Sequence, residues 1–300
     1  LAEELGIWKR GNPFVWHDVY GDPGSNYNSL REWRALNLAA PSLSLQVTGD
    51  PLVDRYPFSV KPEKPITVQR LLAVMRDGYE GTKFDLTEHP AFNPQGKKSP
   101  LARPWGPTEL FDLLGIKAKR ALCTPTSGYV FVAQLRDWLP DTFGNCLWFA
   151  YGPAYTSCFV PIYAGVTDLP DTWDKAPDYT RISRNQVQWN FRLVFSLANN
   201  LRYQDAMQDI QRVFRPAETS FFNIQTHVER TAAKVLRKEG VGGVEHFLNT
   251  YAEHCLTQIG YSYHELVDYL MFRYLVDHSE VAPPKLPVIS APMIPAVPDN

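Results

Sequence analysis

Residues 74–87, VMRDGYEGTKFDLT, bring together nearly every kind of polar side chain that a binding site uses. Carboxylates can hold an ammonium group, and a guanidinium can hold a carboxylate through two parallel hydrogen bonds. A phenol and hydroxyls can add neutral hydrogen bonds. The stretch therefore suits the binding of a substrate better than bond breaking. Its polar residues are Arg76, Asp77, Tyr79, Glu80, Thr82, Asp85 and Thr87.

A purely structural role is the alternative for this stretch. Each acid can equally cap a helix or pair with a neighbouring lysine or arginine. Gly78 and Gly81 are also typical of turns in a solvated connection. Gly81 stands between Glu80 and Thr82, which predicts either a close backbone approach or a positive φ angle at this glycine. The residues alone leave both roles open.

The elements on either side must position these side chains. Residues 66–75 place Leu71, Leu72 and Met75 at helical spacing, so a helix is predicted to run directly into the loop. Residues 88–108 follow with five pairs of a residue and a proline. Their composition predicts neither helix nor strand, and a loop of this length in a compact domain is usually functional or disordered.

The remainder of the chain divides by its periodicity. Alternating β-forming residues predict an antiparallel meander over 128–136, 146–151 and 155–164. From residue 185 the period changes to that of amphipathic helices. These are predicted at 187–201, 204–214, 217–238, 244–259 and 262–278, followed by a proline-rich, extended tail at 281–300.

The overall composition excludes several classes of protein. The 300 residues are 44% hydrophobic with a net charge of −2, which indicates a globular protein and argues against nucleic acid as the main partner. The predicted strands followed by helices make its fold class α+β. No apolar run approaches the roughly 20 residues that a membrane span requires. The four cysteines form no C-x-x-C pair, so a zinc ribbon is not expected. They are predicted to be buried free thiols, with a disulfide between Cys146 and Cys158 as the alternative.

Four blocks in a fixed order resemble one known family. They are residues 75–87, YGDPGSNYNSLREWRALNLAAPSL at 20–43, RALCTPTSGYVFVAQLRDWLP at 120–140, and LWFAYGPAYTSCFVPIYAG at 147–165. The chain resembles, over most of residues 1–205, the bacterial dipeptidase A family. These are cysteine dipeptidases of the N-terminal-nucleophile class, to which the eukaryotic secernins look related.

This resemblance implies a fold and a chemistry. The family fold is an αββα sandwich, and the implied reaction is hydrolysis of dipeptides through a thioester, with an oxyanion hole and without metal or cofactor. The nucleophile of this class is a cysteine at the first position, whose α-amine acts as the base. Leu1 has no nucleophilic atom, so the chain resembles the C-terminal portion of such an enzyme. The missing N-terminal half is then its expected partner, and a homo-oligomer is possible.

The resemblance also directs attention to binding residues. A dipeptide carries an ammonium group and a carboxylate, so an acid is needed for one end and a donor for the other. Glu80, Asp77 or Asp85 are candidates for the ammonium group. Arg76, Arg103 or Arg120 are candidates for the carboxylate, and residues 88–108 are expected to form a wall of the site. The set that we favour for substrate binding is Tyr79, Glu80, Gly81, Thr82, Asp85 and Arg120.

Three divisions of the chain and several alternatives follow. Residues 1–184 are expected to belong to the hydrolase domain, 185–280 to a helical region packed on it, and 281–300 to the tail. The main alternative is a non-catalytic binding or partner module on the same scaffold. Weaker alternatives are an internal catalytic cysteine (Cys123 or Cys158) and a metallopeptidase site built from His246, His254 and His264, whose spacings do not match the H-E-x-x-H pattern.

Overall fold

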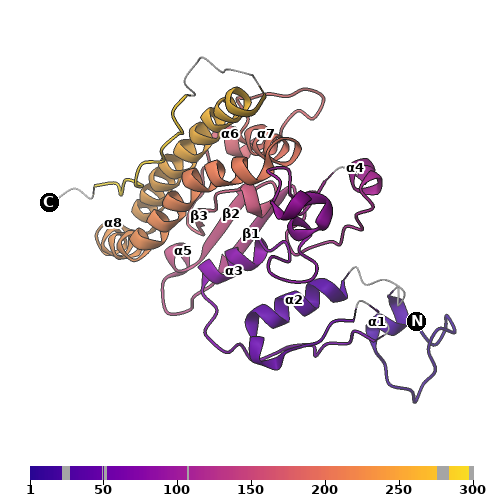
Figure 1. The fold of residues 1–300 in the computed structure, drawn as a ribbon. Helices are drawn as coiled ribbons and strands as arrows, with labels where there is room; N and C mark the ends of the chain where they lie inside the picture. Colours follow the sequence, from indigo (N-terminus) through magenta and orange to yellow (C-terminus); the bar gives the residue numbers. More distant parts are fainter. Residues whose placement is uncertain (22–27, 49, 51–52, 107, 276–283, 297–300) are drawn as a thin grey trace.

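The structure is a computed structural model that describes all residues except 22–27, 49, 51–52, 107, 276–283 and 297–300 (Figure 1). It is a mixed α/β protein in which nearly half of the residues are helical and one small sheet is present, which confirms the α+β class. The α-helices are α1 (Trp16–Tyr20), α2 (Ser29–Ala39), α3 (Val68–Met75), α4 (Thr108–Leu113), α5 (Asp141–Gly144), α6 (Asp171–Asp174), α7 (Val187–Asn200) and α8 (Tyr203–Leu275). The 3₁₀-helices are η1 (Pro41–Leu43), η2 (Leu86–Glu88), η3 (Pro90–Phe92), η4 (Pro94–Gly96) and η5 (Ala154–Thr156).

The sheet is the predicted antiparallel meander. Strands β1 (Tyr129–Gln134), β2 (Cys146–Tyr151) and β3 (Val160–Tyr163) lie in the order β1-β2-β3. The register places Tyr129 opposite Tyr151 and Cys146 opposite Tyr163. Alternation of β-branched and aromatic residues therefore predicted the three antiparallel strands. The predicted start of the third strand at residue 155 is wrong, because residues 154–156 form η5 and β3 begins at Val160.

The two faces of the sheet have different surroundings. On one face Trp148 is fully buried and stacks on Phe222 of α8, with 4.1 Å between the ring centroids. On the other face the rings of Tyr129 and Phe131 are 62% and 47% exposed, although both stack on aromatic neighbours. Helix α8 thus lies along one side of the sheet (Figure 1). On the other side, Tyr129 and Phe131 form an aromatic strip on β1 that is open to solvent.

Helix α8 corrects two of the predicted helix boundaries. Gly240, with φ of 73° and ψ of −165°, interrupts α8 as predicted, and its two halves run side by side (Figure 1). Pro216, by contrast, lies inside the helix. Its cost of about 3 kcal/mol is outweighed by the burial of apolar neighbours such as Phe214 and Phe221.

The second correction concerns the predicted break at residues 260–261, where the helix also continues. Gly260 serves close packing there, because a Cβ atom at this position would lie 2.9 Å from Val187 Cγ2 of α7. Low local helix propensity thus predicted the end of a helix at a position where, in the fold, α8 packs closely against α7.

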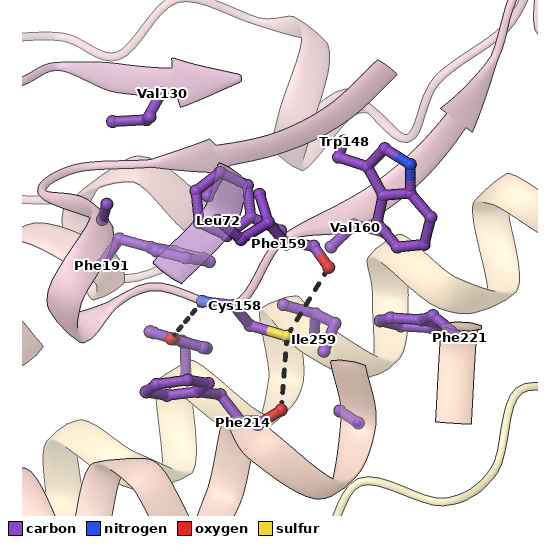
Figure 2. Close-up of a cluster of buried hydrophobic side chains, with 14 of the residues drawn as sticks. Leu72, Val130, Trp148, Cys158, Phe159, Val160, Phe191, Phe214, Phe221 and Ile259 are labelled. Atoms are coloured by element: carbon purple, nitrogen blue, oxygen red, sulfur yellow. Dashed lines mark hydrogen bonds between the residues drawn. The ribbon is translucent and has the colours of Figure 1, made fainter. Parts of the chain in front are cut away.

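The core runs through the sheet, α7 and α8 (Figure 2). Cys158 lies at its centre, where its backbone N–H donates to the Tyr263 hydroxyl at 2.8 Å. Leu286, Ile289 and Ile294 of the extended tail pack against the same core. The described part of the tail, residues 284–296, has no helix or strand, as predicted.

All four cysteines are buried free thiols, as predicted, so the alternative disulfide between Cys146 and Cys158 is wrong. Burial raises the pKa of each thiol, to about 12 for Cys123 and Cys255. None is therefore a thiolate at neutral pH.

Candidate functional site

The polar stretch after α3, residues 76–87, is called the signature loop below. Its position is fixed at the start by α3, whose N-cap Thr67 accepts a hydrogen bond from the backbone N–H of Arg70 at 3.2 Å. The helix ends at Met75, and Arg76 then enters the core. A short, capped helix thus delivers the loop to a buried position, as the sequence predicted.

Arg76 has a structural role. Its guanidinium donates to the carbonyl oxygens of Ala154 and Ser157 at 3.0 and 2.7 Å, and it forms a buried ion pair with Glu218 of α8 at 2.5 Å. The same carboxylate accepts the backbone N–H of Phe159 at 2.7 Å. These contacts join α3, η5, β3 and α8, so Arg76 is not free to bind a substrate carboxylate.

Asp77 is occupied in the same way. Both of its oxygens accept hydrogen bonds from Arg34 of α2, and the shortest is 2.6 Å. Asp77 also accepts the backbone N–H of Tyr79 at 3.0 Å, and its carbonyl oxygen accepts the backbone N–H of Cys123 at 3.0 Å. Asp77 therefore anchors the loop to two other segments rather than facing a ligand.

Tyr79 and Gly81 give the loop its backbone shape. Tyr79 is buried with φ of +73°, a strained region for a residue with a side chain. Its hydroxyl donates to the carbonyl oxygen of Arg120 at 2.7 Å, and burial raises its pKa to about 12. Gly81 has φ of +72° and open space around it, so the conformation rather than crowding requires glycine. This is one of the two reasons that the sequence suggested.

The second half of the loop closes on itself. The Asp85 carboxylate caps η2 by accepting the backbone N–H and the hydroxyl of Thr87 at 3.0 and 2.7 Å, and it also accepts the backbone N–H of Gly81 at 3.1 Å. The Thr82 hydroxyl donates to the carbonyl oxygen of Tyr79 at 2.8 Å. Four of the proposed binding residues thus form hydrogen bonds with one another in pairs, Gly81 with Asp85 and Tyr79 with Thr82.

Glu80 is different from the other acids of the loop. It forms no ion pair with any residue that the structure describes, and its carboxylate accepts a hydrogen bond from the backbone N–H of Gly78 at 2.7 Å. The residue as a whole is exposed, while its carboxyl group folds back onto the backbone of Gly78. This partial desolvation outweighs the hydrogen bond from Gly78 and raises the pKa of the Glu80 carboxyl.

The other arginines that the sequence singled out do not converge on the loop. Arg120 is exposed, and its carbonyl oxygen accepts the hydrogen bond from the Tyr79 hydroxyl. Arg103 is 5% exposed and donates to the carbonyl oxygen of Asn199, and burial lowers its pKa. The candidates for a carboxylate are therefore dispersed over three separate places.

Two cavities share the lining residue Ser127, and one of them reaches Met75, the last residue of α3 before the loop. The larger, about 290 Å³, lies between the end of α3 and β1, and we call it the β1 cavity. It is mostly apolar, and Met75, Leu122, Cys123 and Val130 are among its walls. The smaller, about 210 Å³, lies at the start of α7 beside Arg192, and we call it the α7 cavity.

Sequence reasoning missed the α7 cavity. Arg192 was read only as part of an amphipathic helix, and Tyr179 only as part of a connection. One local signal was present in the sequence. Gln188 and Arg192 are four residues apart at the start of that helix, so their side chains are neighbours on the helix surface.

The three histidines of the helical region do not create a metal site. His264 lies with its Nδ1 atom 3.3 Å from the carbonyl oxygen of Arg184. Among the residues that the structure describes, no three His, Cys, Asp or Glu side chains come together as metal ligands would. The geometry gives the metallopeptidase alternative no support.

Comparison with known proteins places the chain among the peptidases. The model of Peptidase family C69 matches residues 6–215, and the chain belongs to this family. The resemblance to dipeptidases found in the sequence is thereby confirmed.

Several curated relatives are named as dipeptidases. A probable dipeptidase of Salmonella dublin is 27% identical over 182 residues, which are 59% of this chain and 36% of that protein. Dipeptidase A of Lactobacillus helveticus is 22% identical over 188 residues, 62% of this chain and 34% of that protein. A probable dipeptidase B of Lactococcus lactis is 29% identical over 154 residues, 51% of this chain and 27% of that protein. The chain thus spans about a third of the length of these relatives.

A search for membrane-spanning helices was negative for the described part of the chain, in which no helix combines the length and the apolar character that crossing a bilayer needs.

Proposed function

We propose that the protein hydrolyses dipeptides as a cysteine-type peptidase, with this chain supplying the scaffold and part of the substrate pocket. The observation that carries the proposal is the match to Peptidase family C69 over residues 6–215, together with relatives that are named dipeptidases. The reaction would form a thioester on a cysteine, with an oxyanion hole stabilising each tetrahedral intermediate.

The nucleophile of this proposal is a cysteine other than the four in this sequence. Those four are buried, and their raised pKa values keep them protonated at neutral pH. A thiol with such a pKa is a poor nucleophile, because the thiolate is the reactive form.

Glu80 is the acid that we propose for the substrate ammonium group. It is exposed, lacks an ion pair among the described residues, and is held in place by Gly78. Tyr79, Gly81, Thr82 and Asp85 would act by shaping the loop that presents it. Arg120, whose carbonyl oxygen anchors Tyr79, would contribute to the same frame.

The open aromatic strip of β1 supports the αββα arrangement as a proposal. Tyr129 and Phe131 expose 62% and 47% of their surfaces on the face away from α8. Aromatic residues are costly to leave in water, and a second sheet packed about 10 Å away would cover them. In this arrangement residues 1–184 belong to the hydrolase domain, 185–280 pack on it, and 281–300 form the tail.

The test is amino-acid release from a panel of dipeptides by the full-length protein. We expect release that survives a metal chelator and is abolished by iodoacetamide. Glu80→Gln should raise KM for dipeptides, while Glu88→Gln serves as the matched control, because Glu88 pairs with Lys98 on the exposed side of the same segment. No release from any dipeptide would contradict the proposal and favour the non-catalytic binding module.

A further inference from the structure

The α7 cavity lies at one end of the sheet, where several chain segments leave an opening. Gly128 precedes β1 and Gly152 follows β2, and the backbone N–H of Gly152 donates to the carbonyl oxygen of Gly128 at 2.8 Å. Both glycines line the cavity of about 210 Å³. A Cβ atom added at Gly128 would meet nothing within 4 Å, so the absence of side chains here leaves usable space.

Arg192 gives this cavity a positive charge that nothing described neutralises. Its guanidinium forms no ion pair with the described residues. Its only hydrogen bond among them is a long one, 3.4 Å, to the carbonyl oxygen of Pro125. It also lies 5.9 Å from the ring centroid of Phe195. A guanidinium presents five donors in a planar fork, so most of this capacity is unused.

Further donors at the same cavity also lack acceptors. Trp189, one of the lining residues, has its indole N–H buried without a hydrogen-bond partner. The N-cap of α7, Gln186, makes no side-chain capping bond, so the first turn keeps its positive end. A buried donor without an acceptor costs free energy, which binding of an acceptor would recover.

Acids near this cavity are already engaged. Asp178, the residue before the lining Tyr179, accepts hydrogen bonds from Thr180 and pairs with Arg181. These hydrogen bonds lower its pKa, so it stays ionised but compensated. Among the described residues, the cavity therefore keeps a positive charge on Arg192 that no ion pair compensates, which matches an oxyanion.

The apolar walls of the cavity favour a ligand that carries an apolar group beside its oxyanion. Tyr179 and Trp189 meet edge to face with 6.2 Å between the ring centroids. On the other side of Ser127 the β1 cavity offers about 290 Å³ lined by Met75, Leu122 and Val130. An amino-acid carboxylate with its apolar side chain combines the two features.

We propose that the α7 cavity binds the carboxylate of a small peptide-like ligand, with Arg192 as the cation and the adjoining apolar walls holding the neighbouring side chain. The choice of a dipeptide as the natural ligand rests on the proposed function, whereas the carboxylate site itself does not. Arg192 is then the carboxylate-binding residue, in place of the Arg76, Arg103 or Arg120 that the sequence suggested.

Direct binding tests the site without any need for catalysis. The probes are N-acetyl-L-leucine, which carries the carboxylate, and N-acetyl-L-leucinamide, which does not, titrated by calorimetry into the full-length protein. We expect the acid to bind about 10- to 100-fold more tightly than the amide, as a charge-assisted contact implies. Equal affinity for the two probes, or no binding of either, would overturn the proposal.

Variants locate the effect. Arg192→Met should abolish the preference for the acid and Arg192→Lys should retain part of it, while Arg202→Met, which removes an exposed arginine paired with Asp205, should change nothing. Gly128→Leu should block binding by filling the cavity. Unaltered circular dichroism and melting temperature would show that each variant folds. Retained acid preference in Arg192→Met would contradict the assignment.

A kinetic comparison separates this inference from the proposed function. If the protein hydrolyses dipeptides, Arg192→Met should raise KM about 10- to 100-fold with a smaller change in kcat, and should do so for dipeptides but not for dipeptide amides. Hydrolysis with unchanged KM in this variant would refute the carboxylate site and leave the function standing. Acid-selective binding without hydrolysis of dipeptides would support the carboxylate site and contradict the proposed function.

Discussion

The signature loop and the α7 cavity differ in what their polar groups do. In the loop, Arg76 and Asp77 are held in ion pairs, while Asp85 accepts three hydrogen bonds within the loop. At the cavity, the Arg192 guanidinium has no ion pair among the described residues, and the Trp189 indole N–H has no acceptor. The polar groups named in the loop thus have hydrogen-bond or ion-pair partners, whereas the donors named at the cavity still have unused capacity.

This difference teaches that a dense set of polar side chains does not by itself mark a binding surface. Satisfied polar groups fix a conformation, because a buried charge that loses its partner is costly. Unsatisfied groups beside a cavity are what a ligand can complete. We therefore propose the loop as the frame of the site, with Glu80 as the acid that it contributes, and the α7 cavity as the place where the carboxylate of a ligand binds.

The largest expected effect is the loss of stability when the ion pair between Arg76 and Glu218 is removed. Glu218→Leu should lower the free energy of unfolding by about 3–5 kcal/mol, because Arg76 is left as a buried charge without its partner. Urea denaturation measures the change. The matched control is Glu88→Leu, whose ion pair with Lys98 is exposed and should contribute about 0–1 kcal/mol. A loss below about 1 kcal/mol in Glu218→Leu would show that the pair does not anchor the loop.

A smaller effect concerns the backbone of the loop. Gly81→Ala should destabilise the protein by about 1 kcal/mol, since its φ of +72° is unfavourable for alanine although space is available. Gly242→Ala provides the comparison, because it lies in α8 with open space and no positive φ, and should stabilise by about 0.5–1 kcal/mol. Thermal unfolding of the two variants measures whether the melting temperature falls in the first and rises in the second. Equal shifts would contradict the strain at Gly81.

Thiol reactivity tests whether this chain can supply the nucleophile. At pH 8 a thiol with a pKa of about 12, such as Cys123, is ionised in about one molecule in ten thousand. Reaction of the native protein with iodoacetamide should therefore leave all four of these cysteines unmodified in a peptide map, whereas denatured protein should show all four alkylated. Alkylation of one of them in parallel with loss of activity would make it the nucleophile.

The smallest expected effect is a pH dependence from Glu80. Its folded-state pKa is raised above the unfolded value, so the native state binds more protons between the two values, and stability falls as the pH rises through that range. Glu80→Gln should remove this dependence and raise stability at pH 7 by less than about 1 kcal/mol. Melting temperatures from pH 4 to 8 measure it. A destabilised variant would mean that the carboxylate is part of the frame.

Local patterns predicted much of the fold. The meander, the helix that ends at Met75 and the interruption at Gly240 follow from alternation, helical spacing and turn residues, which act over a few positions. The helix through Pro216 and the contact at Gly260 did not, because tertiary packing overrode local propensity there.

The site was less predictable than the fold. The sequence proposed the loop as a binding site, but the partners that engage two of its charged residues, Arg34 and Glu218, lie 43 and 142 residues away from Asp77 and Arg76. Arg192 acquires its role only when α7 is placed against the turn before β1. Neither relation is visible as a spacing in one chain.

The most direct test of this contrast is amide hydrogen exchange of the protein with and without saturating N-acetyl-L-leucine. We predict slower exchange at residues 124–128 and 187–192, which border the α7 cavity, and unchanged exchange across the signature loop, because its groups are already engaged. Protection of residues 76–87 with none at the start of α7 would contradict the account and return the carboxylate site to the loop.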